Sequence, residues 1–184
     1  EQGGAEAQQV IRLLTPMVKK FTAEQGVYLV RECMELMGGI GYIEDGVMPK
    51  LMRDMMVLPI WEGAGNIMVL DMLRAMRKSE GLELILAEID GSIREDQQEA
   101  FQQVVALLKE LPGLDREEQE ATATPLLEKL TALYTLNLLH RYRNEESQQW
   151  IDPAIGYLES RASVPRRVKP VAAEVVQAMM AWEY

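Results

Sequence analysis

The stretch that decides the fold runs from Glu32 to Met76 and reads ECMELMGGIGYIEDGVMPKLMRDMMVLPIWEGAGNIMVLDMLRAM. It contains two glycine-bearing turns, GGIGY at residues 38–42 and EGAGN at residues 62–66, each flanked by apolar residues at helical spacing. Glycine permits a positive φ or a close approach of the backbone to another group. The turns are therefore the candidate functional positions, and the rest of the chain is predicted to form a helical scaffold around them.

Before and between the turns the pattern predicts helices. Residues 5–37 carry apolar side chains at helical spacing, and Pro16 either kinks one helix there or opens a second one. Residues 38–48 are predicted to form a loop, and a short helix is predicted to start with Pro49 and run to Met56. Residues 57–61 are predicted to be extended, because a proline at position 59 disfavours helix at the residue before it.

Downstream of the second turn the sequence also predicts helices. The first has Asn66 as its expected N-cap and runs to about Lys78. Its predicted inward side chains are Ile67, Leu70, Leu73 and Met76. Further helices are predicted over residues 82–89 and 93–111, from Thr124-Pro125 onward, from Asp152-Pro153 to Ser160, and from Pro165 onward.

No alternation of apolar and polar residues is long enough for a strand. The predicted fold class is therefore all-α, an up-and-down helical bundle. Residues 1–78 are predicted to form its first part, and residues 79–184 an acidic helical extension that packs on it.

Composition excludes several classes of function. Apolar residues make up 48% of the 184 residues, which is ample for a core, and the net charge of −10 disfavours nucleic acid and anionic membranes as partners. A single cysteine rules out an intramolecular disulfide and fits a reducing, cytoplasmic location. No apolar run approaches the roughly 18 residues that a membrane span needs. Residues 1–4 do not resemble a signal peptide, and the chain is expected to be cut from a longer one.

Several reactive or distinctive residues have structural explanations. Cys33 is predicted to be a small core residue and His140 a helix-terminal surface residue, and one residue of each type does not make an ordinary zinc site. The acidic pair at residues 44–45 and the acidic run at 115–120 are predicted to be solvated. A group of methionines either fills the core or lines a groove for a long apolar ligand, and the sequence leaves both open. These are Met34, Met37, Met48, Met52, Met55, Met56, Met68, Met72 and Met76.

Glu62 is the candidate catalytic residue, because it lies between an apolar run and the start of a helix. Its neighbours Pro59, Ile60 and Trp61 are expected to shield it partly from water. Shielding of this kind raises the pKa of a carboxylate toward the range that a general base needs. The N–H groups at the start of the following helix could donate to an oxyanion or to a polar ring edge. From the residues alone, an acidic first turn without a catalytic role is the favoured interpretation.

Three motifs carry a family resemblance: GGIGY at residues 38–42, MPKLMRD at 48–54 and IWEGAGNI at 60–67. In order and spacing they resemble the C-terminal helical domain of acyl-CoA dehydrogenases, over roughly residues 5–78. The WEGAGN segment is more similar to the branch that contains the bacterial alkylation-response flavoprotein than to the fatty-acid enzymes, which usually read Tyr-Glu-Gly-Thr. The resemblance implies an FAD-dependent enzyme that oxidises an acyl-CoA thioester to an enoyl-CoA.

The resemblance also implies roles for individual residues. Glu62 matches the base that removes the α-proton of the acyl-CoA, while the β-hydride passes to N5 of FAD. Gly63 matches a residue that touches the substrate. The positions that match FAD contacts form two groups, the second of which contacts the adenosine and pyrophosphate of an FAD held mainly by a neighbouring subunit. They are Ala64, Gly65 and Asn66, and then Glu35, Leu36, Met37, Gly38 and Gly39.

The chain departs from the family pattern at two of these positions. Glu35 stands where the family often has Gln, and a carboxylate repels pyrophosphate unless it faces a ribose or an Arg. Ala64 lacks the hydroxyl of the usual Thr or Ser. The family's N-terminal helical domain and middle β-domain have no counterpart in these residues. The chain is therefore interpreted as a C-terminal fragment that carries the base, and alone it is not expected to retain FAD or turn over substrate.

Three functions follow from the resemblance: a dehydrogenase domain, a protective DNA-binding module of the alkylation-response type, and a structural oligomerisation domain. Residues 79–184 contain 10 Lys and Arg against 19 Asp and Glu, so DNA binding is expected to be weak and steeply salt-dependent. The dehydrogenase is therefore preferred. Its implied partners are an acyl-CoA, further copies of the chain in a homodimer or homotetramer, and, as an option, electron-transfer flavoprotein.

Overall fold

The computed structural model describes residues 4–161 and contains only helices and turns in that range. The eight α-helices are α1 (Ala5–Leu36), α2 (Gly39–Tyr42), α3 (Met48–Val57), α4 (Gly65–Lys78), α5 (Gly81–Asp90), α6 (Gln98–Glu110), α7 (Arg116–Tyr142) and α8 (Gln148–Arg161). Two short 3₁₀ turns, Glu95–Gln97 and Leu111–Gly113, flank α6. The all-α prediction is confirmed.

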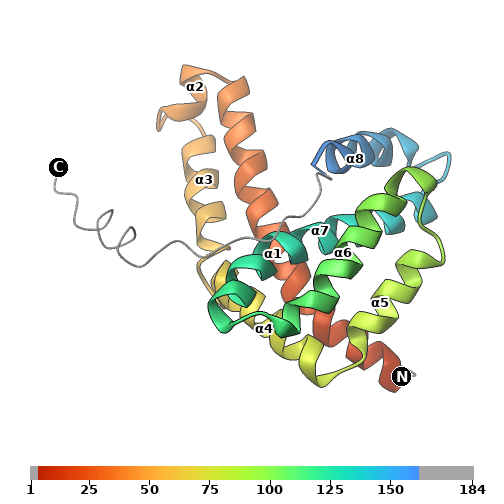
Figure 1. Ribbon diagram of the computed structural model, residues 1–184. Helices are drawn as coiled ribbons and strands as arrows, with labels where there is room; N and C mark the ends of the chain where they lie inside the picture. Colours follow the sequence, from red (N-terminus) through yellow and green to blue (C-terminus); the bar gives the residue numbers. More distant parts are fainter. Residues whose placement is uncertain (1–3, 162–184) are drawn as a thin grey trace.

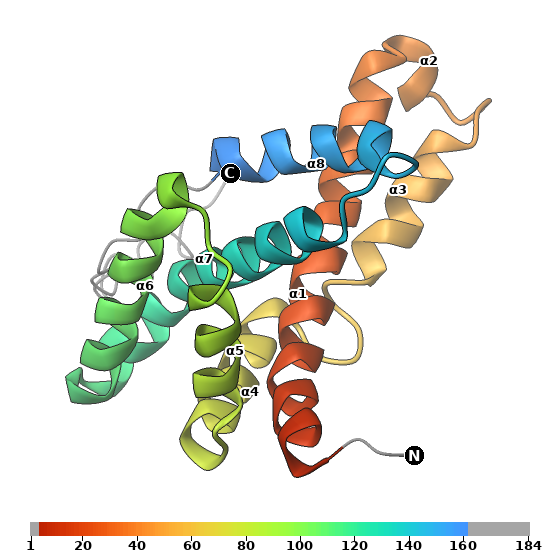
Figure 2. The ribbon, with the colours of Figure 1, turned by 90° about the vertical axis from the view of Figure 1, so that its right-hand side faces the viewer.

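The C-terminal part of α1, together with α2 and α3, forms a long hairpin that projects from the rest of the molecule, with α2 at its tip (Figures 1 and 2). Pro16 lies inside α1, so one continuous helix forms and no second helix opens there. The prediction of a loop over residues 38–48 is wrong at its start, where α2 makes one helical turn. The predicted extended segment after α3 is also wrong, because local hydrogen bonds such as Trp61 N–H to the Val57 carbonyl close it into turns.

Three predicted helix starts are corrected by caps and turns nearby. Helix α4 begins at Gly65 with Ala64 as N-cap, one residue before the predicted helix start, so Asn66 is not the cap. Helix α7 begins before Thr124-Pro125, because the Asp115 side chain accepts the Glu118 N–H at 2.8 Å. Helix α8 begins before Asp152-Pro153, after a turn in which Asn144 Oδ1 accepts backbone N–H groups.

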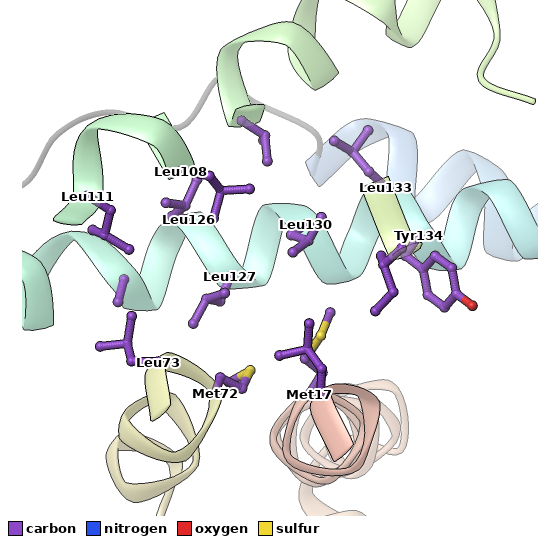
Figure 3. Packing of buried hydrophobic residues seen from close by; sticks show 14 of the residues in the cluster. Met17, Met72, Leu73, Leu108, Leu111, Leu126, Leu127, Leu130, Leu133 and Tyr134 are labelled. Atoms are coloured by element: carbon purple, nitrogen blue, oxygen red, sulfur yellow. The ribbon is translucent and has the colours of Figure 1, made fainter. Parts of the chain in front are cut away.

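One hydrophobic cluster lies where α1 and α4 cross the middle of α7 (Figure 3). Met17 from α1 and Met72 from α4 face Leu127 and Leu130 of α7, and all four side chains are almost fully buried. The same cluster includes residues from both 1–78 and 79–184. The predicted division at residue 78 nevertheless stays a prediction, because a shared core does not locate a domain boundary.

Buried and half-buried ion pairs fix α1 against its neighbours. Lys20 is 7% exposed and donates to Glu24 and, at 2.9 Å, to Glu128 of α7. Burial alone would lower the pKa of Lys20, but these two hydrogen bonds outweigh it and raise that pKa above its usual value. Arg12 makes a bidentate pair with Asp71 of α4, at 2.8 and 2.6 Å. The hydrogen bond from Arg12 lowers the pKa of Asp71.

The Arg12–Asp71 pair predicts a pH-dependent contribution to stability. Because the folded pKa of Asp71 lies below its ordinary value of 3.8, the contribution is fully present above that value and is lost as the pH falls through the folded pKa. We expect Asp71→Asn to cost about 0.5–1 kcal/mol near neutral pH, the scale of a partly exposed pair. Thermal melts of both proteins should differ near neutral pH and converge as the pH falls through the folded pKa of Asp71.

The inward face of α4 differs from its prediction in one respect. Leu73 is buried and Leu70 and Met76 are partly buried, whereas Ile67 is 47% exposed. No helix within residues 4–161 has the length and apolar character that a membrane crossing needs. The helix predicted from Pro165 lies outside the described residues.

Candidate functional site

The second glycine-bearing turn connects α3 to α4 and has an unusual backbone. Glu62 has a φ of 54° and is the one non-glycine residue with positive φ in the described part of the chain. Gly63 follows with a φ of 105°. A left-handed glutamate is disfavoured by its Cβ, and such conformations persist where the surrounding structure holds them, often at functional sites. This turn therefore stands out as a candidate site on backbone geometry alone.

The Glu62 side chain is exposed, which corrects the expectation that its apolar neighbours shield it. Ile60 and Trp61 are themselves 61% and 69% exposed, because the turn carries them outward instead of packing them around the carboxylate. Glu62 lies at the edge of a groove of about 420 Å³ between α1 and the turn. The groove is lined by Lys19, Thr22, Ala23, Val57, Leu58, Trp61 and Glu62. Its volume is in the range of small-molecule sites.

Lys19 contacts this turn directly and was not singled out by the sequence. Its Nζ donates to the Leu58 carbonyl at 3.0 Å and to the Gly63 carbonyl at 2.5 Å. Lys19 stands 44 positions before Gly63, inside an ordinary helical pattern. Only the packing of α1 against the turn brings the two together, so no local sequence signal could have indicated the contact.

The start of α4 presents backbone N–H groups without a side-chain cap. Asn66 is exposed and its Oδ1 accepts the neighbouring N–H of Ile67 instead of closing the helix end. Gly65 packs against Glu24, whose Oε1 would lie 3.2 Å from a Cβ at that position. The groups that the start of α4 offers to a ligand are therefore its first backbone N–H groups, and an uncapped helix N-terminus favours a group with partial negative charge.

The other predicted contact segment, Glu35 to Gly39, lies at the far tip of the hairpin. All five residues are exposed, and Leu36 is 87% exposed. The ten residues of α3 separate this tip from Glu62, which at 1.5 Å per residue is about 15 Å along the helix. The structure therefore does not bring the two predicted groups together within one chain. Arg31, one turn before Glu35, interacts electrostatically with it.

The remaining candidate residues have simple placements. Cys33 is exposed, so its predicted core position is wrong. His140 ends α7 as predicted but is half-buried, since Glu159 of α8 lies 3.8 Å from its Nε2. Among the methionines, Met48 and Met72 are buried, while Met37 and Met56 are exposed. Residues 4–161 contain no cluster of His, Cys, Asp and Glu able to hold a metal ion.

Residues 3–77 match the family model of the acyl-CoA dehydrogenase C-terminal domain. Over this segment the chain is similar to the C-terminal domain of acyl-CoA dehydrogenases. Within it lie the hairpin, the Glu62 turn and α4 up to its last turn. The resemblance drawn from the three motifs is thereby confirmed.

The chain spans only a small part of the length of the relatives that it matches. The chain is 45% identical over 86 residues to the putative acyl-CoA dehydrogenase AidB of Escherichia coli, covering 46% of this chain and 16% of AidB. It is 44% identical over 75 residues to acyl-CoA dehydrogenase family member 11 of Caenorhabditis elegans, covering 41% and 12% of the two chains. The crystal structure of Caenorhabditis elegans ACDH-11 in complex with C11-CoA matches with a TM-score of 0.68 and 26% identity, over 97% of this chain and 33% of ACDH-11. The structural similarity thus extends well beyond residues 3–77.

Proposed function

We propose that this chain acts as the C-terminal helical domain of an FAD-dependent acyl-CoA dehydrogenase, with Glu62 as the base that removes the α-proton of the acyl-CoA. The observation that carries the proposal is the left-handed turn that places the Glu62 carboxylate at the edge of an open groove. The match of residues 3–77 to the family model and the C11-CoA bound in the ACDH-11 structure support it.

The chemistry requires a base close to the α-carbon and an acceptor for the β-hydride. FAD, when bound, supplies that acceptor. Glu62 would take up the proton at a carboxylate oxygen, and Gly63, with no side chain, would leave room for the thioester beside it. Because Glu62 is exposed in this chain, the proposal requires that bound substrate, cofactor and other parts of the assembled protein exclude water from it, since a solvated carboxylate is a weak base.

Two segments of this chain have surfaces that are compatible with contacts to FAD. At Gly38 and Gly39 no atom lies within 4 Å of the position that a Cβ would take, so a cofactor could approach the backbone there. Beside them, Arg31 pairs with Glu32 and also interacts electrostatically with Glu35. At the other segment, the uncapped N–H groups of α4 are the available donors. We propose that Ala64, Gly65 and Asn66 contact FAD, and that residues 35–39 contact the distal part of an FAD bound mainly by a neighbouring subunit.

The hairpin supports the proposal of a homodimer or homotetramer. Its described surface carries exposed apolar side chains, among them Leu36, Ile40 and Tyr42, at 87%, 67% and 78% exposure. Exposed apolar groups of this density mark surfaces that other molecules cover. Electron-transfer flavoprotein and a cytoplasmic location remain proposals at the level of the family.

The experiment that tests the proposal uses the FAD-loaded protein that contains these residues. Anaerobic addition of an acyl-CoA should bleach the visible flavin absorbance, and a series of chain lengths should define the substrate. No bleaching with any saturated acyl-CoA would contradict the proposal. The alternative, a DNA-protective module, would gain if the same protein bound duplex DNA with an affinity that survives physiological salt, which the acidic composition argues against.

A further inference from the structure

Lys19 brackets the turn that carries Glu62. Its ammonium group donates to the carbonyl of Leu58, where α3 ends, and to the carbonyl of Gly63, directly after Glu62. The two acceptors therefore lie near the two ends of the segment that connects α3 to α4. A single side chain from α1 thus fixes both ends of this segment to the scaffold.

The backbone hydrogen bonds of the turn lie in its first half. Its hydrogen bonds, from the N–H groups of Leu58, Ile60 and Trp61, all point back to α3. Within residues 4–161 no backbone hydrogen bond outside the helices involves Glu62 or Gly63. Among the described residues, the hydrogen bond that holds this left-handed pair therefore comes from Lys19.

The hydrogen-bond partners of Lys19 differ from those of other lysines and support a role in holding the turn. Other Lys side chains with close contacts here, such as Lys20 and Lys50, pair with carboxylates. In the part of the chain that the structure describes, Lys19 has no carboxylate partner and uses its charge on two backbone carbonyls. Charge-assisted hydrogen bonds are about twice as strong as neutral ones, so the contact can hold a disfavoured backbone conformation.

We propose that Lys19 is a positioning residue for the Glu62 carboxylate: it clamps the turn from Leu58 to Gly63 and thereby holds Glu62 in its left-handed conformation at the groove. The role in catalysis rests on the proposed function of Glu62, whereas the clamping of the turn does not. Misplacement of a reacting group by about 1 Å can cost a factor of about 100 in rate. We therefore expect loss of the clamp to reduce proton abstraction about tenfold to a hundredfold.

The first test measures the turn itself in the chain of 184 residues, by amide hydrogen exchange. Lys19→Met keeps the length and removes the donors, and it should speed exchange of the hydrogen-bonded amides of Leu58, Ile60 and Trp61 relative to the amides of α5 in the same sample. Lys19→Arg retains charge and donors and should restore much of the protection. Lys50→Met is the matched control, because Lys50 is exposed and pairs with Asp54 on its own helix. Unchanged exchange in Lys19→Met, or an equal increase in Lys50→Met, would overturn the clamp.

The second test asks whether Lys19 acts through Glu62 in the FAD-loaded protein. Lys19→Met should lower the maximal rate of flavin reduction with little change in the acyl-CoA concentration for half-maximal rate. In a Glu62→Gln background it should have no further effect, because the group that it positions is gone. An equal loss in both backgrounds would overturn the positioning role. If Glu62→Gln itself leaves the rate unchanged, the proposed function fails, and the exchange result still decides the clamp.

Discussion

Replacement of Glu62 by Gln is expected to slow the reduction of bound FAD by an acyl-CoA by a factor of about 10²–10⁴. Gln has nearly the same shape and keeps a hydrogen-bonding oxygen, but it cannot accept the α-proton. Because Glu62 is exposed and has no ion pair in the described structure, its replacement should leave the fold and the melting temperature almost unchanged. The rate is measured by anaerobic stopped-flow mixing under saturating acyl-CoA.

The matched control for this variant is Glu145→Gln, which makes the same substitution at an exposed position between α7 and α8. It should leave the rate of flavin reduction unchanged. Loss of bound flavin together with activity in Glu62→Gln would indicate a structural role for Glu62. Flavin reduction at the original rate would mean that another residue is the base.

Truncation of Leu130 to Ala is expected to lower the free energy of unfolding by about 2–5 kcal/mol. Leu130 is completely buried on α7, where side chains from α1 and α4 meet it (Figure 3). The substitution removes apolar contacts and leaves a cavity that the surrounding helices can fill only in part. Denaturant unfolding of the 184-residue chain, monitored by circular dichroism, measures the change.

Leu29→Ala provides the comparison, because Leu29 is on α1 and is 58% exposed. It should lower the free energy of unfolding by well under half as much as Leu130→Ala, because folding buries little apolar area at that position. A loss below about 1 kcal/mol for Leu130→Ala would mean that α7 does not share a cooperative core with α1 and α4. Two separate unfolding transitions would lead to the same conclusion.

The fold class could be predicted from the sequence because helical periodicity is a local signal. The apolar positions of α1, α6 and α7 follow that period, and Leu13, Phe101 and Leu130 are buried accordingly. The predicted element bounds are wrong where a proline was the local signal. Pro125 and Pro153 predict helix starts nearby, whereas both lie inside helices that begin earlier in the chain. The extended segment predicted around Pro59 is instead closed by hydrogen bonds to the end of α3.

The candidate site was located by its glycine pattern and by family resemblance, but its physical character could not be predicted. The exposure of Glu62 and of Trp61 depends on the path of the turn, which composition does not specify. The contact from Lys19 depends on how α1 packs beside the turn, across 44 positions of sequence. Such long-range contacts leave no trace in a single sequence, since a lysine on a helix face is compatible with many environments.

The most direct test of the central claim is α-hydrogen exchange in an acyl-CoA that cannot donate a β-hydride, such as one with sulfur in place of the β-carbon. Incubation in D₂O with the FAD-loaded protein isolates proton removal from oxidation, and mass spectrometry counts the deuterium that enters the α-position. We expect deuterium to enter with the original protein and with Glu145→Gln, and incorporation to fall to background with Glu62→Gln. Equal incorporation with and without the Glu62 carboxylate would contradict the account.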